Sequence, residues 1–128
     1  MSNCRAMSKK RILFVDNRPE YVRQPVIRLQ LEGYDVGEAE SGAAALQTLK
    51  DESFDLLILD AQLPDEDGWG VLRAVRKNAA LADLKVIVLM AGKGETGMLV
   101  LVPVDAELRR PFSMRSLLES VRRVIGSP

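Results

Sequence analysis

Histidine is missing from this sequence of 128 residues, and cysteine occurs once, at Cys4. Without histidine, the chain lacks the commonest general base and the commonest metal ligand. One cysteine can form neither an internal disulfide nor the thiolate cluster of a structural zinc site. We therefore expect a protein that is not an enzyme, and the lack of a disulfide framework is typical of a cytoplasmic setting.

An excess of positive charge is also missing, because 18 lysine and arginine residues balance 18 aspartate and glutamate residues. This balance gives no reason to expect a nucleic acid or an anionic membrane as partner. No apolar run approaches the roughly 20 residues that a membrane-spanning helix needs. The basic start "MSNCRAMSKKR" is followed only by "ILFV", which is too short for the core of a signal peptide.

What the sequence does contain is a regular alternation of strand and helix patterns within the length of one ordinary domain. We expect a tail over residues 1–9, a single domain over 10–126, and no output domain. Continuous apolar runs read as strands buried on both faces, and amphipathic segments lie between them. The pattern predicts a doubly wound α/β domain with a parallel central sheet. The expected strands are "RILFV" (11–15), "YDVGEA" (34–39), "FDLLILD" (54–60) and "LKVIVLM" (84–90).

Several residues mark the ends of the expected helices. Pro19 suits a first helical turn and Gly33 suits a C-terminal cap. Ser41 and Ser113 are placed as N-caps of two further helices. Pro25 lies inside the first helix pattern, where it removes a backbone hydrogen bond and costs about 3 kcal/mol. We therefore expect that helix to be kinked or to start late.

Four separated motifs occur in the order and approximate spacing of a known family: "ILFVDN", "LLILDAQLPDEDGWGVLRAVR", "VIVLMA" and "RRPF". Together they resemble the receiver domain of bacterial two-component response regulators, from about Lys10 to Ile125. The resemblance implies a flavodoxin-like fold with a five-stranded parallel sheet and five helices. It also implies that Asp60 accepts a phosphoryl group from a histidine kinase.

The resemblance places a Mg²⁺ site and a set of switch positions around Asp60. The metal ligands would be Asp16, Asn17, Asp60 and the backbone carbonyl of Gln62. The switch and phosphate-contact positions would be Met90, Ala91, Glu107 and Arg110. Four of these positions depart from the family pattern. An amide replaces an acid at Asn17, and methionine replaces a hydroxyl residue at Met90. Glutamate replaces the switch aromatic at Glu107, and arginine replaces lysine at Arg110, although the two are not interchangeable.

These departures suggest an atypical or pseudo-receiver, in which Asp60 is kept but the usual cycle of phosphorylation and side-chain rotation does not operate. We expect Mg²⁺ to bind weakly and no other cofactor to be needed. Such a protein would act by docking to a histidine kinase or another signalling protein, and a homodimer stays open. The alternative is a competent receiver that accepts phosphate on Asp60. Arg110 either serves that reaction or forms a fixed ion pair with Asp60.

A glycine-rich segment, "GKGETG" (92–97), matches the spelling of a dinucleotide-binding turn. Such a turn should follow the first strand and open a long helix, whereas this segment follows the fourth expected strand. A flavodoxin-like nucleotide-binding module is therefore only a third alternative. We expect instead that the fourth crossover helix is degenerate between Gly92 and Val104.

Overall fold

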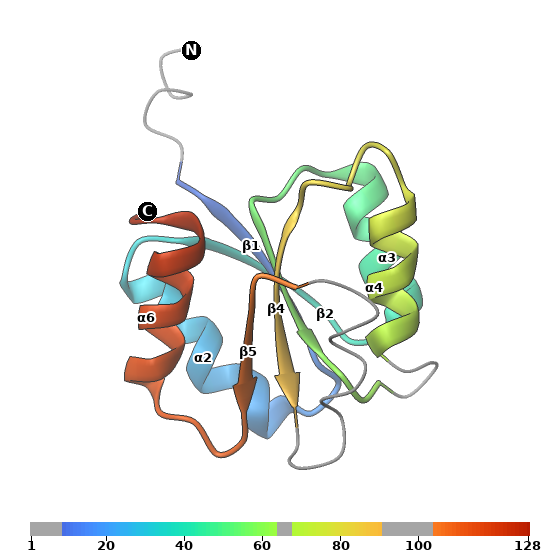
Figure 1. Cartoon of the computed structure of the whole chain (residues 1–128). Coiled ribbons are helices and arrows are strands. Elements are labelled where there is room, and N and C mark those ends of the chain that lie inside the picture. The colour runs from blue at the N-terminus through green and yellow to red at the C-terminus, as the bar shows by residue number, and fades with distance from the viewer. Residues whose placement is uncertain (1–8, 64–67, 91–103) are drawn as a thin grey trace.

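The computed structural model describes residues 9–63, 68–90 and 104–128. Within these ranges, five strands form one parallel sheet in the order β2-β1-β3-β4-β5 (Figure 1). The predicted doubly wound parallel sheet is therefore confirmed. The strands are β1 (Arg11–Val15), β2 (Asp35–Ala39), β3 (Leu56–Asp60), β4 (Lys85–Met90) and β5 (Ala106–Arg109).

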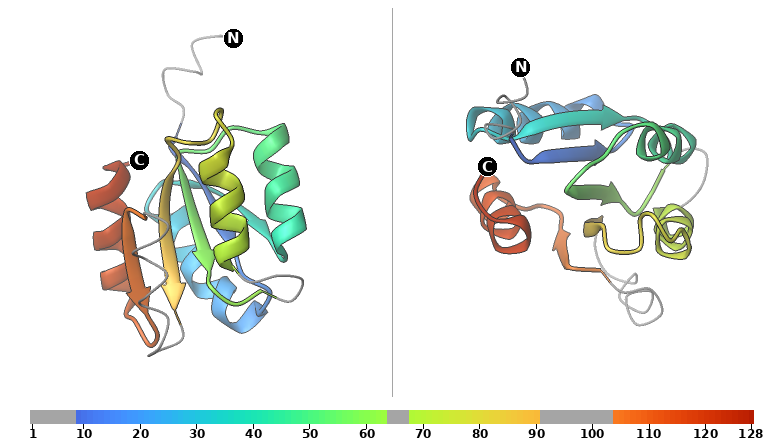
Figure 2. Two further views of the ribbon diagram at one scale, coloured as in Figure 1. Left: turned by 45° about the vertical axis from the view of Figure 1, so that its right-hand side comes forward. Right: turned by 90° about the horizontal axis from the view of Figure 1, so that it is seen from above.

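Helices cover both faces of this sheet (Figure 2). Helices α2 (Pro19–Leu31) and α6 (Met114–Ile125) pack on one face, and α3 (Gly42–Asp51) and α4 (Gly68–Lys77) pack on the other. Side chains alternate between the faces of each strand, so Ile12 and Phe14 belong to the first layer, while Leu13 and Val15 belong to the second. The three central strands are buried almost throughout, which explains their continuous apolar sequences.

The helix ends follow the predicted chemistry. The Ser41 hydroxyl accepts a hydrogen bond from the Ala44 amide at 3.1 Å, and Ser113 caps α6 in the same way. Gly33 has a φ of +111°, the left-handed conformation that glycine adopts readily after a helix. All three positions are confirmed.

Pro25 does not delay the start of α2, so that part of the prediction is wrong. The helix begins at Pro19 and continues through Pro25 to Leu31. The Pro25 ring is buried on the same side as Val22, Val26 and Leu29. Packing of this apolar face against the sheet offsets the lost backbone hydrogen bond.

Two predictions lie outside the described residues. The degenerate fourth helix between Gly92 and Val104, and the glycine-rich segment within it, fall almost wholly in the range 91–103. Among the helices that the structure describes, none is long and apolar enough to cross a membrane.

Contacts at the amino edge of the sheet join the end of α6 to the segments beside β1. The Lys10 ammonium group donates to the Ile125 carbonyl oxygen. The Tyr34 hydroxyl donates to the Gly126 carbonyl oxygen at 2.7 Å, and Tyr34 is buried. We call these two contacts the C-terminal clasp.

Candidate functional site

Two acidic side chains lie next to each other at the carboxyl edge of the sheet. Asp16 follows β1 and Asp60 ends β3, and β1 and β3 are parallel neighbours. Each residue is only 2% exposed. In open parallel sheets, the carboxyl ends of the strands at the reversal of strand order are where ligands bind. The sequence therefore brings a buried acid pair to the position where such a fold usually carries its site.

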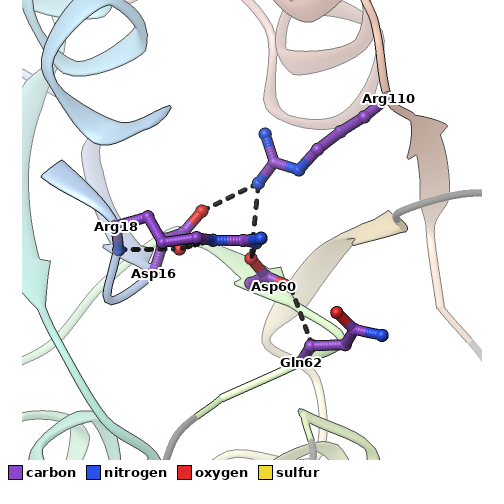
Figure 3. A network of polar contacts seen from close by, with 5 residues as sticks. All are labelled: Asp16, Arg18, Asp60, Gln62 and Arg110. Carbon is purple, nitrogen blue, oxygen red and sulfur yellow. Dashed lines mark hydrogen bonds and ion pairs between the residues drawn. The ribbon is translucent and has the colours of Figure 1, made fainter. Parts of the chain in front are cut away.

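Two guanidinium groups reach this acid pair from opposite sides (Figure 3). Arg18 lies at the N-cap of α2, and Arg110 follows β5. The Arg18 Nη2 atom contacts Asp60 Oδ2, and its Nε lies 3.3 Å from Asp16 Oδ1. The Arg110 Nη2 atom lies 2.7 Å from Asp16 Oδ2 and 3.4 Å from Asp60 Oδ2. Two positive charges thus balance two buried negative charges.

Every carboxylate oxygen of the pair accepts a hydrogen bond from the chain itself. Asp16 Oδ1 accepts from the backbone amide and the Nε of Arg18, and Asp16 Oδ2 accepts from Arg110. Asp60 Oδ1 accepts from the Gln62 amide at 2.7 Å. Asp60 Oδ2 accepts from both arginines. A ligand for these oxygens would have to displace donors that are already in place.

Two groups at the site, Asp16 and Arg18, have shifted pKa values. Burial raises the pKa of Asp16 above its usual range, and repulsion from Asp60 adds to the rise, while the amide and charge of Arg18 oppose it. For Arg18, burial alone would lower the guanidinium pKa, but the charges of Asp60 and Asp16 outweigh it and raise that pKa. The hydrogen bond and charge of Arg18 therefore favour the charged form of Asp16.

Aromatic rings support the two arginines. The Arg18 and Arg110 guanidinium carbons lie 4.6 Å and 4.5 Å from the centre of the Tyr21 ring. Arg110 also lies 5.6 Å from the Phe112 ring centre. Cations at such distances are attracted by the negative face of the ring. An open pocket of about 470 Å³ lies beside them, lined by Arg18, Glu20, Tyr21, Gln24, Pro25, Arg110, Pro111, Phe112 and Met114.

Gly68 allows the backbone of α4 to approach the acid pair closely. The Gly68 amide donates to the Ala61 carbonyl oxygen at 2.8 Å. A β-carbon added at Gly68 would lie 2.2 Å from the Asp60 carbonyl oxygen and 2.8 Å from the Ala61 α-carbon. Glycine at this position is therefore required by the contact between α4 and the end of β3.

The other predicted site residues are dispersed. Asn17 is exposed, and the Gln62 amide is used as a donor to Asp60. The Met90 side chain is fully buried in the core, and its carbonyl oxygen accepts a hydrogen bond from the Arg110 amide at 2.8 Å. Glu107 is exposed and lies 3.6 Å from Arg109. Ala91 lies outside the described residues.

Arg18 is the site residue that the sequence reasoning missed. A signal for it existed, because serine, threonine, aspartate and asparagine are preferred at an N-cap, and positive charge is unfavourable at the N-terminus of a helix. Arg18 makes no side-chain cap and instead extends to the acid pair. An arginine where a helix prefers an acceptor, two residues after an acid, can indicate an ion pair with a buried carboxylate.

The residues as arranged do not fit Mg²⁺. This ion requires near-octahedral oxygen ligands and binds through free carboxylates. Both carboxylates here are engaged by arginines, and no group of three or more potential ligand side chains occurs in the described ranges. Binding of Mg²⁺ to Asp16 and Asp60 would first require the guanidinium groups to leave.

Comparison with known proteins identifies the family. The family described as response regulator receiver domain matches this chain over residues 12–122. The chain belongs to the response regulator receiver domain family. Receiver domains are signalling modules that interact with histidine kinases, and they bind Mg²⁺ in their phosphorylation reaction.

Similar sequences and structures agree with this assignment. Transcriptional regulatory protein GltR of Pseudomonas aeruginosa is 34% identical over 116 residues, which are 89% of this receiver domain and 48% of GltR. A CheY-like receiver domain protein from Methanospirillum hungatei shares 28% identity with a TM-score of 0.84, covering 91% of this chain and 93% of the other. A sensor protein from Polaromonas shares 27% identity with a TM-score of 0.80, covering 91% and 95%. The chain spans about half the length of the curated relatives it matches.

Proposed function

We propose that this receiver domain acts mainly by docking to a signalling partner, with phosphorylation of Asp60 weak or absent. The observation that carries this proposal is that two arginines of the chain itself occupy the acid pair. The positive charge that a Mg²⁺ ion would bring to the two carboxylates is already supplied by Arg18 and Arg110. The acid site is then a stable structural element, and its surroundings are the surface that a partner meets.

Further support comes from the positions that would transmit phosphorylation. The Met90 side chain lies in the core and has no hydroxyl group to donate to a phosphoryl oxygen. Glu107 is exposed. Burying its charged carboxylate among apolar side chains would be costly, so Glu107 cannot take the buried position of an aromatic switch residue. Neither Met90 nor Glu107 therefore has the side-chain chemistry to convert phosphorylation of Asp60 into a conformational change at the surface.

The partner in this proposal is a histidine kinase or another signalling protein in the cytoplasm. A second copy of the same chain is the other partner to test, by analytical ultracentrifugation over a range of protein concentrations. A concentration-dependent dimer would identify self-association as one form of docking.

One observation favours a second candidate, a receiver that is competent for phosphorylation. The Nε atom of Arg110 is buried and has no hydrogen-bond partner among the described residues. An unpaired buried donor is costly, and a phosphoryl oxygen on the neighbouring Asp60 would accept its hydrogen bond. In this candidate, the arginines would stabilise the charge of the phosphoryl group during transfer.

Intact-mass spectrometry after incubation with acetyl phosphate and Mg²⁺ tests the proposal. Three proteins are compared: the parent, Asp60→Asn, and Arg18→Met, in which the stem of Arg18 is kept but its charge is removed. We expect little adduct on the parent, none on Asp60→Asn, and more on Arg18→Met because one guanidinium has left Asp60.

A nearly complete adduct on the parent that Asp60→Asn abolishes would refute the proposal and support the second candidate. Repeating the incubation with EDTA separates two versions of that candidate. An adduct that persists with EDTA would assign charge stabilisation to the arginines, and an adduct that disappears would assign it to the metal.

A further inference from the structure

Tyr21 is the aromatic residue that links the acid site to the surface. It lies in the first turns of α2 and is 42% exposed. Its ring centre lies within 4.6 Å of the guanidinium carbons of both Arg18 and Arg110. No other ring in the described part of the chain contacts both arginines. One exposed ring therefore touches both cations that hold the acid pair.

The ring offsets an unfavourable feature of the site. Arg18 and Arg110 both direct an Nη2 atom to the same oxygen, Asp60 Oδ2, so two positive charges lie close together. Like charges repel, and the negative face of an aromatic ring attracts both cations. The ring thus favours the arrangement in which the two guanidinium groups converge on the carboxylates.

The hydroxyl group of Tyr21 contributes little to this arrangement. It makes no hydrogen bond within the described residues, whereas the ring makes both cation contacts. Phenylalanine should therefore replace Tyr21 without loss, and an aliphatic residue should not. This difference provides a matched control.

The aromatic residue that contacts both arginines is not on β5, where the family resemblance would place the switch aromatic. The corresponding residue, Glu107, is exposed and lies near Arg109. The contact comes instead from α2, on the side of Arg18.

We propose that Tyr21 is a positioning residue that keeps Arg18 and Arg110 on the acid pair and so closes the pair to divalent cations. This inference rests on the proposed function, in which the arginines keep the site closed.

Magnesium titrations of variants test this inference, with isothermal titration calorimetry and Trp69 fluorescence as readouts. Trp69 is 6% exposed and follows Gly68, which packs against Asp60. We expect Tyr21→Phe to bind Mg²⁺ as weakly as the parent. We expect Tyr21→Leu to bind at least about five-fold more tightly, since two cation contacts are lost. Arg18→Met serves as the open reference and should show the largest gain.

The outcomes separate failure of this inference from failure of the proposed function. If Arg18→Met gains affinity and Tyr21→Leu does not, the arginines close the site without Tyr21, and the inference is wrong. If Tyr21→Phe gains as much as Tyr21→Leu, the ring is not what holds the arginines. If Arg18→Met gains nothing, the closed site itself is refuted. Circular dichroism checks folding, and Tyr21→Gln replaces Tyr21→Leu if the latter does not fold.

Discussion

The ion pair between Arg18 and Asp60 should be energetically coupled, and a double-mutant cycle measures the coupling. The cycle uses Arg18→Met, Asp60→Asn and the double variant. Asp60→Asn keeps the shape of the side chain, Arg18→Met keeps the aliphatic stem, and both remove the charge. The Asp60 side chain is 3% exposed and that of Arg18 is 30% exposed, so the pair lies between a surface pair and a fully buried one.

The magnitude follows from charge separation and exposure. Two unit charges about 4 Å apart attract by about 4 kcal/mol at an effective dielectric constant of about 20. Contact with water and the ordering of the arginine side chain reduce this value. We expect a coupling energy of about 2 kcal/mol. Arg18→Met alone should lower the free energy of unfolding by about 2 kcal/mol, because Asp60 stays buried with Arg110 as its remaining cation.

Urea unfolding followed by Trp69 fluorescence provides the assay, because Trp69 is buried and becomes exposed on unfolding. With a slope of about 2 kcal/mol per molar urea, Arg18→Met should lower the midpoint by about 1 M. In the Asp60→Asn background, the same substitution should lower the midpoint much less, because the Asp60 charge is gone and only the contact of Arg18 with Asp16 is lost.

Additive effects would refute this reasoning. If the two single changes sum to the effect of the double variant within about 0.5 kcal/mol, the pair behaves as independent sites. Arg18 would then be an ordinary surface arginine, and the closed acid site would lose its main support.

Three further predictions concern the surrounding fold. Gly68→Ala should destabilise the domain by at least about 2 kcal/mol because its β-carbon overlaps backbone, whereas Gly37→Ala, with its nearest contacts at 3.5 Å, should change the urea midpoint little. Ser41→Ala should cost about 1 kcal/mol in the same urea assay, through loss of the N-cap. Burial raises the pKa of Tyr34, so the folded state holds its proton over a range where the unfolded state, with a pKa of about 10, loses it. Stability should therefore fall more steeply above about pH 10 in the parent than in Tyr34→Phe, and equal slopes in pH-dependent urea titrations would contradict this.

Much of the fold follows from local patterns that the sequence displays directly. Apolar runs such as 11–15 and 84–90 are continuous because helices cover both faces of those strands. A strand buried on both faces can therefore be recognised from its sequence alone. Ser41 and Ser113 cap their helices through contacts only three residues away. The effect of Pro25 cannot be read from local sequence, because the packing of the whole helix face outweighs the local preference of proline.

The candidate site was predictable only in part, for a similar reason. Asp16 and Asp60 follow strands that must be neighbours, so their proximity could be inferred. The ion pair between Arg110 and Asp60, left open as one alternative, is present in the structure, although Asp16 is the nearer partner of Arg110. Arg18 was not found, because its contact with Asp60 joins residues 42 positions apart through the conformation of a long side chain. The direction in which the Arg18 side chain extends depends on tertiary packing, which sequence periodicity does not indicate.

Helix α6 connects the two edges of the sheet, from the acid pair at the carboxyl edge to the C-terminal clasp at the amino edge. Its 12 residues span about 18 Å, from the loop after Arg110 to the C-terminal clasp. Arg110 lies just before one end of this helix, and Tyr34 holds the other end through its hydrogen bond to Gly126. The hydrogen bond from Lys10 to Ile125 links the start of β1, the strand that precedes Asp16, to the end of α6. The acid pair is thus connected to the amino edge of the sheet along two separate elements, β1 and α6.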